Sequence, residues 1–486
     1  MKKKIVIIGA GFSSLSAACY LAKAGYRVQM LEKNNSVGGR ARQRLKSGFK
    51  FDIGPTWYWM PDIFERFFSD FDQTPSSYYT LDRLDPAYQV YFGRDDSIKI
   101  PGNTTDIYKV FEEEELGSSK ALKKFLSSAA FNYRVAVNDL IYKPGLSFLE
   151  LVNKHTISRL WQFFTSIRQS VNRLFSSRRL RKIVEFPVLF LGAKPSRTPA
   201  FYNFMNYADF GLGTWHPKGG MSEVVNAFVK LATSLGVDIK TDQDVRKIVV
   251  EKGFVKGVFV ADHFIAADIV ISGADYQFTE SILEKAYRTY AKSYWESRTF
   301  APSALLFFVA FDTNIQNVSH HTLFFDTDFD EHASAIYDQP KWPKEPLFYA
   351  SFPSITDGSF APVSKESATF LIPLAPGVKD TPEKREAYFL KIIQRLEHLT
   401  GQQLAKQVLF KESYCVSDFI KDYNAFKGNA YGLANTLMQT AFLRPGIKSK
   451  KVKNLYFTGQ LTVPGPGVPP AIISGKIVAD QIINQR

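Results

Sequence analysis

The chain opens with short apolar segments in an order that predicts alternating strands and helices. The β-branched run Lys4–Ile8 predicts a buried parallel strand, Leu15–Ala24 is rich in alanine and leucine and predicts a helix, and Arg27–Leu31 predicts a second strand. The turn between the first strand and the helix carries Gly9 and Gly11. This order is typical of a βαβ unit that binds a dinucleotide.

Similar patterns return in the middle and at the end of the chain. A helical pattern that ends at Leu235 precedes further strand-like runs, which by themselves also fit a separate sheet. Near the carboxyl end, a short strand up to Gly459 and a glycine-proline loop precede a helix over Ala471–Gln485. We therefore predict an α/β fold in which a discontinuous Rossmann-like domain (1–105, 220–300 and 440–486) is interleaved with a second domain. This second domain (106–219 and 301–439) is expected to be α+β, with a mixed or antiparallel sheet and a helical part over 145–195.

The first glycine turn indicates how a dinucleotide would be held. Gly9 permits the tight turn, Gly11 lets the backbone approach a pyrophosphate, and the start of the helix offers N–H groups and a positive dipole. Glu32 ends the second strand, where its carboxylate can accept hydrogen bonds from ribose hydroxyls. Ser14 replaces the usual third glycine and is small enough for close packing. The predicted contacts of this unit are Gly9, Gly11, Phe12, Ser13, Ser14, Glu32 and Lys33.

The segment after Glu32 distinguishes between cofactors. Its residues Gly38-Gly39-Arg40-Ala-Arg42 resemble the glycine–glycine–arginine stretch of the flavin amine-oxidase superfamily, although a surface turn with a solvated arginine also fits. Gly54-Pro55-Thr56 resembles the segment that runs beside the flavin ring in that superfamily. The resemblance implies FAD. It also implies contacts from Gly39, Arg40, Arg42, Gly54, Pro55, Thr56, Val245, Gly459, Gln460, Gly467, Val468 and Pro469, and a substrate side that includes Trp57, Trp59, Trp215 and His216.

The whole chain resembles the bacterial-type phytoene desaturases within the carotenoid desaturase family. Beside the amino-terminal motifs, the resemblance rests on Trp215–Gly220, Asn424–Gly432 and the loop that begins at Asn454. The terminal loop departs from the family pattern at Gln460, Leu461, Val463 and Pro466. These departures leave the particular carotenoid open, and 1-hydroxycarotenoid 3,4-desaturases share the same framework. A flavin amine oxidase and a non-catalytic prenyl-lipid escort protein are further alternatives.

Composition and charge bear on location. The chain has 42 Phe, 23 Tyr and a net charge of +14, but no zinc spacing or RNA-binding motif, so an anionic membrane surface is a better partner than nucleic acid. Two cysteines give no disulfide framework and favour a reducing cytoplasm. No apolar window is long enough to span a bilayer. Transfer of a C40 hydrocarbon into water would cost about 30 kcal/mol, so we expect a peripheral enzyme on the inner face of the cell membrane.

The segment Lys154–Lys182 suggests how the enzyme would dock. It contains basic residues and no acid, and Leu160, Phe164, Ile167 and Val171 recur at helical spacing. This pattern predicts a basic amphipathic helix that forms a membrane-facing mouth together with Phe186–Ala193. A helix packed on its own domain with a solvated basic face would show the same pattern.

Desaturation removes a hydride and a proton from neighbouring carbons. FAD can accept the hydride, and the polyene can delocalise the developing cation, so the sequence indicates no catalytic side chain. No metal spacing is present, and we interpret His320-His321 as a solvated or hydrogen-bonded pair. The final electron acceptor, oxygen or a membrane quinone, stays open.

Overall fold

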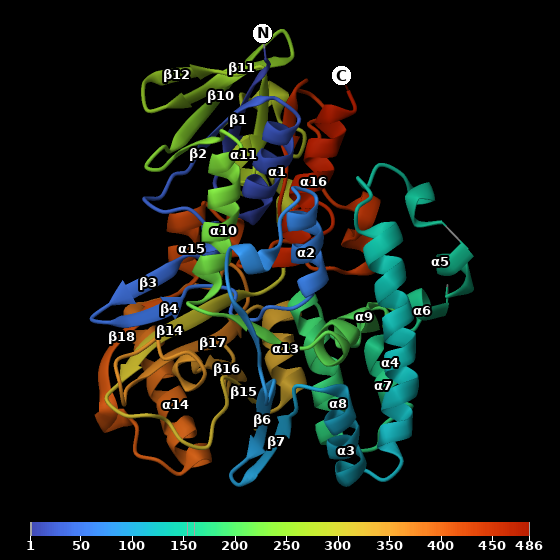
Figure 1. Cartoon of the computed structure of the whole chain (residues 1–486), viewed down its shortest axis with the longest axis vertical. Coiled ribbons are helices and arrows are strands. Elements are labelled where there is room, and N and C mark those ends of the chain that lie inside the picture. Colours follow the sequence, from blue (N-terminus) through green and yellow to red (C-terminus); the bar gives the residue numbers. More distant parts are fainter. Residues whose placement is uncertain (1, 153, 160, 486) are drawn as a thin grey trace.

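Five parallel strands form a sheet at one end of the molecule, in the order β19-β13-β1-β2-β9. The structure is a computed structural model that describes residues 2–152, 154–159 and 161–485. Figure 1 shows the sheet next to both termini. Its strands are β1 (Lys4–Ile8), β2 (Arg27–Leu31), β9 (Asp238–Lys240), β13 (Ile269–Ser272) and β19 (Leu455–Phe457). They come from three separated stretches of the chain, because each stretch supplies apolar residues for a strand buried on both faces.

The two faces of this sheet are covered differently. Ile5 and Ile7 of β1 pack with the helices on one face, whereas Val6 and Ile8 pack with a three-stranded antiparallel sheet on the other. The helices are α1 (Phe12–Lys23), α2 (Pro61–Ser69), α10 (Met221–Ser234) and α16 (Val468–Ile483). The opposite face carries β10 (Val245–Glu251), β11 (Phe254–Val260) and β12 (His263–Ala266), with α11 (Tyr276–Ser281) and α12 (Lys292–Glu296) beside them.

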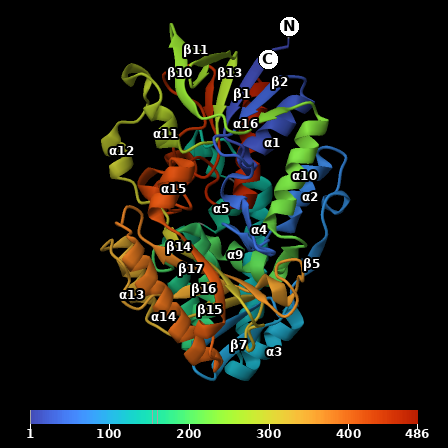
Figure 2. The same ribbon diagram turned by 90° about the vertical axis from the view of Figure 1, so that its left-hand side faces the viewer.

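A second sheet lies at the other end of the molecule, as Figure 2 shows. It has seven strands, which are antiparallel except for the parallel pair β15 and β6. In spatial order they are β18 (Val408–Tyr414), β14 (Ser303–Phe311), β17 (Glu366–Leu374), β16 (Phe348–Ser351), β15 (His321–Phe324), β6 (Tyr88–Gly93) and β7 (Asp96–Ile100). The helix α14 (Pro382–Thr400) covers one face through Phe389, Ile392 and Leu396. The hairpin β3 (Gln43–Lys46) and β4 (Phe49–Asp52) packs on the other face.

Thus β6 and β7, which lie within residues 1–105, belong to the second sheet and not to the parallel one. The domain bounds drawn from the sequence stay a prediction. Short connecting elements complete the fold: β5 (Leu81–Arg83), β8 (Trp215–Pro217), α13 (Phe329–Tyr337) and α15 (Val416–Tyr423).

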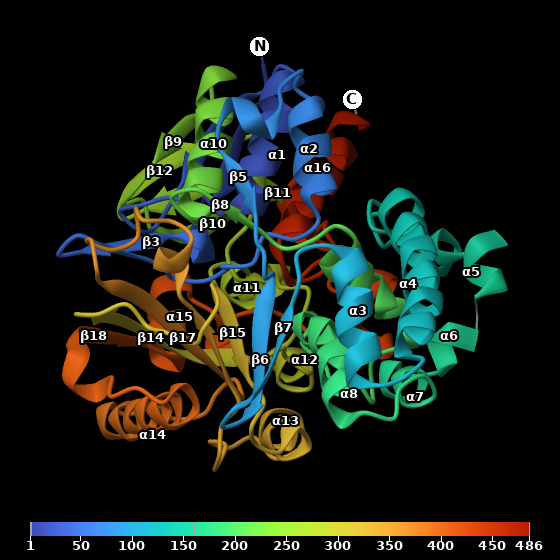
Figure 3. The same ribbon diagram turned by 60° about the horizontal axis from the view of Figure 1, so that its bottom comes forward.

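A group of helices flanks the seven-stranded sheet, as Figure 3 shows. They are α3 (Thr104–Glu114), α4 (Ser118–Val135), α5 (Lys154–Ser158), α6 (Trp161–Phe164), α7 (Ile167–Asn172), α8 (Arg178–Glu185) and α9 (Phe204–Asn206). The prediction of one amphipathic helix over Lys154–Lys182 is therefore wrong, since this range holds several short helices; Leu160 lies outside the described residues.

The basic side chains of this region are largely engaged within the protein. Arg168 pairs with Glu185 at 3.0 Å and with Asp330 at 2.6 Å, and Arg179 pairs with Glu114. Ile167 and Val171 are fully buried because α7 packs on its own domain.

The run Phe186–Ala193 also differs from its predicted role. Phe186–Leu191 forms 3₁₀ turns, and Phe186, Val188 and Ala193 are buried. Phe186 and Leu189 line the cavity described below, and Phe186, Val188 and Ala193 do not form an exposed mouth.

Candidate functional site

Two glycine-containing turns meet at the carboxyl end of β1. Gly9 turns the chain after the strand, and Gly11 begins α1 without any side chain to cap its first N–H groups. The second turn approaches from the side, where Gly38 N donates to Ala10 O at 2.8 Å. Gly39 has a φ of +56°, and a Cβ there would lie 3.2 Å from the Cα of Gly11. The close contact leaves space for a ligand where side chains would otherwise stand.

Glu32 lies beside this turn and is 5% exposed. One carboxylate oxygen accepts from Ala10 N at 2.8 Å, and the other accepts from Asn34 N at 2.9 Å. The oxygen bonded to Asn34 N also accepts from Asn34 Nδ2 at 2.8 Å. The oxygen bonded to Ala10 N keeps a second acceptor position, so Glu32 can still accept a ribose hydroxyl. Gln243 N donates to Glu32 O at 2.8 Å, which brings the start of β10 at Val245 to the same edge.

Arg40 connects the second glycine turn to two distant segments. Its Nη2 donates to Asn429 O at 3.3 Å and lies 3.1 Å from the Gln460 amide. Its guanidinium stacks over the Tyr423 ring at 4.9 Å, and its Nε is buried without a partner. Burial lowers the pKa of this arginine, and the nearby Asp275 acts in the opposite direction.

The other two predicted basic contacts point elsewhere. Arg42 pairs with Asp422 at 2.8 Å, and Lys33 donates to Lys421 O and to Asn424 Oδ1. Both side chains thus hold the end of α15 against the glycine turn.

Helix α16 packs tightly against α1 and brings the terminal loop to the same place. A Cβ at Gly475 would lie 2.3 Å from Ser13 O, and one at Gly459 would lie 3.2 Å from Ser13 Oγ. Ser14 faces Gly273 at the end of β13, where a Cβ would lie 2.0 Å from its Oγ. The third glycine of the fingerprint is replaced by serine here because the strand opposite supplies a glycine.

These features fit a bound dinucleotide. The uncapped start of α1 can hold a pyrophosphate. The buried Arg40 Nε, which has no partner within the protein, provides a further donor. The start of α16, with Gly467, Val468 and Pro469, opens into a cavity where the rest of the cofactor would emerge.

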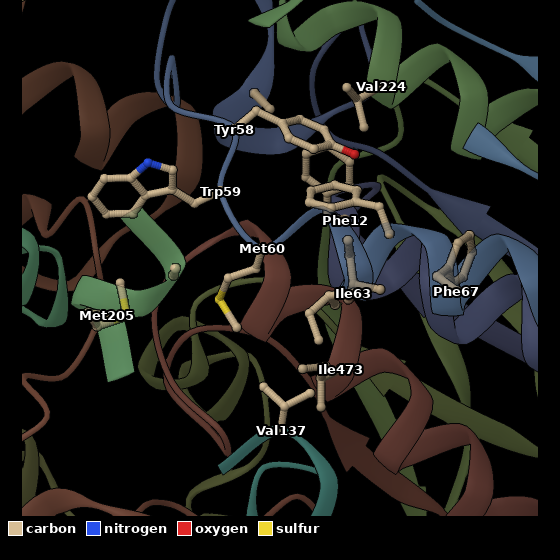
Figure 4. Packing of buried hydrophobic residues seen from close by; sticks show 14 of the residues in the cluster. Phe12, Tyr58, Trp59, Met60, Ile63, Phe67, Val137, Met205, Val224 and Ile473 are labelled. Carbon is tan, nitrogen blue, oxygen red and sulfur yellow. The ribbon is translucent and has the colours of Figure 1, made fainter. Parts of the chain in front are cut away.

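This cavity has a volume of about 710 Å³ and a predominantly apolar wall. It runs between the start of α16, the seven-stranded sheet and the flanking helices. Figure 4 shows part of the wall, to which Trp59, Met60, Val137, Met205 and Ile473 contribute. Such a volume is typical of a site for a small organic ligand.

The segment after Gly54 forms one side of the cavity. A Cβ at Gly54 would lie 2.2 Å from Arg40 O, so glycine is required for this approach. Pro55, Thr56, Trp57 and Trp59 line the cavity. Tyr58 points away from Trp59, as Figure 4 shows, and stacks on Phe64 with 4.2 Å between ring centroids.

Trp215 and His216 do not belong to the described cavity lining, contrary to the prediction for the substrate side. Trp215 Nε1 donates to Leu212 O at 2.9 Å, and His216 Nε2 lies 3.1 Å from Asp357 Oδ2. Strand β8 therefore places His216 in packed surroundings, whereas Trp215 is half-buried and points to the opposite face of the strand.

The sequence did not predict a series of hydrogen-bonded side chains in the cavity wall. Tyr349 lines the cavity, and its hydroxyl lies 2.7 Å from Thr56 Oγ1 and 2.7 Å from His321 Nδ1. His321 is fully buried, and its Nε2 has no partner. His320 bonds Thr356, so the histidine pair is hydrogen-bonded as predicted. These hydrogen bonds join residues that are far apart in sequence, so no local pattern could reveal them.

Exposed apolar side chains surround one end of the cavity. Val152, Phe164 and Met438 belong to its lining and are 44%, 77% and 70% exposed. Leu149 and Trp161, next to these residues in sequence, are also exposed. This group, Leu146, Leu149, Val152, Trp161, Phe164 and Met438, is called the mouth patch below.

Comparisons with known proteins agree with this geometry. The family described as flavin containing amine oxidoreductase matches residues 12–483. The chain belongs to this family. It is an FAD-dependent oxidoreductase of mixed α/β fold.

Curated relatives extend over nearly the whole chain. A carotenoid 3,4-desaturase from Haloarcula japonica is 39% identical over 99% of this chain and 98% of its own length. A zeta-carotene-forming phytoene desaturase from Myxococcus xanthus is 28% identical over 99% of this chain and 94% of its own. An oxidoreductase structure from Methanosarcina mazei has a TM-score of 0.65 at 18% identity, covering 98% of this chain and all of that one. Cyclohexylamine oxidase from Brevibacterium oxydans has a TM-score of 0.59 at 15% identity, covering 100% of this flavoenzyme and 99% of that chain.

Two further observations concern only the residues that the structure describes. None of the helices in that part of the flavoenzyme is long and apolar enough for a membrane crossing. Nor does that part contain a group of three or more His, Cys, Asp or Glu side chains placed to hold a metal ion.

Proposed function

We propose that this flavoenzyme is a carotenoid desaturase that introduces double bonds into a C40 polyene. The observation that carries the proposal is the apolar cavity of about 710 Å³, which is bordered by both the Gly54–Thr56 segment and the start of α16. A hydrocarbon chain that enters this cavity buries no polar group of its own, so its binding carries no cost of polar desolvation. FAD supplies the hydride acceptor when bound, and the protein holds the polyene against it and keeps water out.

The sequence identity to the two curated relatives favours a substrate from a later step of carotenoid synthesis. Identity to the carotenoid 3,4-desaturase is 39%, against 28% for the zeta-carotene-forming phytoene desaturase, at equal coverage of this chain. We therefore place 3,4-desaturation of an already unsaturated, hydroxylated carotenoid first. Desaturation of phytoene toward lycopene is the second candidate.

An amine substrate is less compatible with the cavity. Among its described lining residues, Glu150 is the single carboxylate, and it accepts from Gly145 N and Leu146 N. A protonated amine taken into such a wall would lose its hydration without gaining a free counter-ion.

The mouth patch supports substrate entry from a bilayer. Six exposed apolar side chains at the opening would be solvated if the enzyme stayed in water, and they can insert into the lipid interface. A net charge of +14 favours an anionic surface such as the inner face of a cell membrane. Membrane quinone or dissolved oxygen would then reoxidise the flavin.

The test uses purified holoprotein and two sets of liposomes. One set contains phytoene and the other contains an acyclic 1-hydroxycarotenoid, and products are separated by chromatography with absorbance detection. We expect a red-shifted product from the hydroxycarotenoid. A product from phytoene alone would move the assignment to the second candidate, and no product from either polyene would refute carotenoid desaturation.

A further inference from the structure

The cavity wall contains one hydroxyl group that is backed by a buried imidazole. We propose that Tyr349 is a catalytic residue that takes up the proton released in desaturation, and that His321 receives the phenolic proton of Tyr349 in the same step. The inference deepens the proposed function and rests on it.

The hydrogen bonds define the direction of transfer. Tyr349 Oη lies 2.7 Å from His321 Nδ1 and 2.7 Å from Thr56 Oγ1. If Tyr349 donates to the imidazole, Thr56 donates to Tyr349. The phenolic oxygen has a second acceptor position, which the Ser351 side chain also faces, so Ser351 must turn away when the polyene delivers its proton. Tyr349 is only partly buried because it faces the cavity.

Other titratable groups in the described wall lack such an arrangement. Both ring nitrogens of His332 are bonded to backbone groups, at 2.9 Å each. Glu150 accepts from the backbone N–H groups of Gly145 and Leu146, and the Tyr202 hydroxyl bonds that of Thr440 at 3.0 Å. The described lining residues with titratable side chains are Lys143, Glu150, Tyr202, His332, Tyr337, Tyr349 and Tyr431.

The proposed step balances atoms and electrons. One carbon of the polyene loses a hydride to the flavin and becomes cationic. The neighbouring carbon releases a proton to Tyr349 Oη, and the electron pair of that C–H bond becomes the new π bond. The proton originally on Tyr349 moves to His321 Nδ1, so the phenol stays neutral and the imidazole becomes an imidazolium. Reoxidation of the reduced flavin by oxygen or quinone consumes a proton, which restores the neutral imidazole.

The surroundings suit a neutral imidazole that becomes charged only briefly. Burial, followed by the effect of His216, lowers the pKa of His321 well below its ordinary value, so the ring is neutral before the reaction. A proton next to a carbocation is far more acidic than an imidazolium, so even a weak base accepts it. The titratable groups that face the pair are His320 and His216, with Asp357 behind them, and Tyr431 and Asp52 on the side of Tyr349.

Two substitutions test the relay in the holoenzyme. Tyr349→Phe removes the accepting hydroxyl, and His321→Gln removes the base behind it. We expect each to slow anaerobic flavin reduction by the carotenoid at least a hundredfold, within the range of roughly 10²–10⁴ for a lost general base. Tyr79→Phe is the matched control, because it also removes a buried hydroxyl bonded at 2.7 Å, to Tyr58, but lies outside the cavity lining.

The pH profile distinguishes the relay from a structural role. In the wild type the rate of flavin reduction should fall at acidic pH as His321 becomes protonated, and this acidic limb should be absent in His321→Gln. A second readout needs no turnover: in protein with ¹⁵N-labelled histidine, the His321 signal should report a neutral ring at pH 6 and should shift in Tyr349→Phe.

The outcomes separate this inference from the proposed function. If the wild type reduces its flavin with a carotenoid and Tyr349→Phe does so equally fast, the relay is refuted while the function stands. If no carotenoid reduces the wild-type flavin, the proposed function fails. A His321 signal that does not respond to Tyr349→Phe refutes the hydrogen-bonded pair in either case.

Discussion

The Trp57 indole lies parallel to the His321 imidazole, with 4.1 Å between the ring centroids and 13° between the planes. A ring stacked in this way stabilises a positive charge on its neighbour through the electrons of its face. Trp57 thus has a dual position, since it lines the cavity and also covers the imidazole that we propose as proton acceptor.

The stacking predicts a graded effect of substitutions at Trp57. Trp57→Leu removes the aromatic face and should slow flavin reduction roughly 3–30-fold, whereas Trp57→Phe keeps a face and should retain most of the rate. Anaerobic bleaching of the flavin absorbance measures both rates, with flavin content as the control. Equal losses in the two variants would show that shape and not the aromatic face matters.

The contact between the two glycine turns predicts loss of flavin in Gly39→Ala. The added methyl group would lie 3.2 Å from Gly11 Cα, and the alanine would also have to adopt the positive φ of residue 39. We expect at least a tenfold weaker affinity for FAD, measured by titration of the apoprotein. Gly25→Ala is the matched control, because Gly25 has a φ of +86° with nothing within 4 Å. A similar loss in both variants would attribute the effect to backbone strain alone.

The mouth patch predicts which side chains bind liposomes. Phe164→Glu combined with Trp161→Glu should reduce binding to anionic vesicles about tenfold or more, because buried apolar area is replaced by charge that the membrane repels. Co-sedimentation measures binding. Val363→Glu, at a site that is 93% exposed and lies elsewhere, should bind as the wild type does. Unchanged binding of the double variant would exclude the patch as the docking surface.

Asp209 predicts a pH dependence of stability. Burial raises its pKa to about 8 from an ordinary 3.8, although hydrogen bonds from Tyr88 and Thr214 act in the opposite direction. The folded state therefore holds this proton more tightly than the unfolded chain. The resulting stabilisation is present below pH 4 and is lost as the pH rises toward 8, by at most about 1.4 kcal/mol per pH unit.

Asp209→Asn removes this titration. Between pH 5 and 8 the thermal midpoint of the wild type should therefore fall more than that of the variant. Differential scanning calorimetry at several pH values compares the two slopes. Other carboxyls with a raised pKa, such as Asp52 and Glu366, contribute equally to both proteins. Identical slopes would mean that Asp209 is ionised in the folded protein.

The sequence predicted the parts of the fold that local pattern determines. The βαβ unit and the terminal glycine-proline loop lie where the pattern placed them, because a buried parallel strand and a glycine turn have strong local signals. The prediction of one helix over Lys154–Lys182 was wrong because tertiary packing, and not local pattern, determines the structure there. The apolar spacing fits a helix, but Ile167 and Val171 turn inward and Ser166 starts a new helix within the range.

The candidate site was predictable only in part. Trp57 and Trp59 line the cavity, on the substrate side that the family resemblance implied. Tyr349 gave no signal, and the His320-His321 pair did not indicate a place in the cavity wall. Tyr349 and His321 lie on strands of the other sheet and reach Thr56 only through tertiary structure. Tertiary packing also decides the position of His216, whose partner Asp357 lies far along the chain.

The parallel sheet has a consequence for how the enzyme is made. Strand β19 and helix α16 come from the last part of the chain, yet they pair with β13 and pack on α1. A chain synthesised only as far as β18 lacks these segments, so its flavin pocket is without one wall. The cofactor can therefore be held only after β19 and α16 have been added, and products truncated before β19 would carry no flavin.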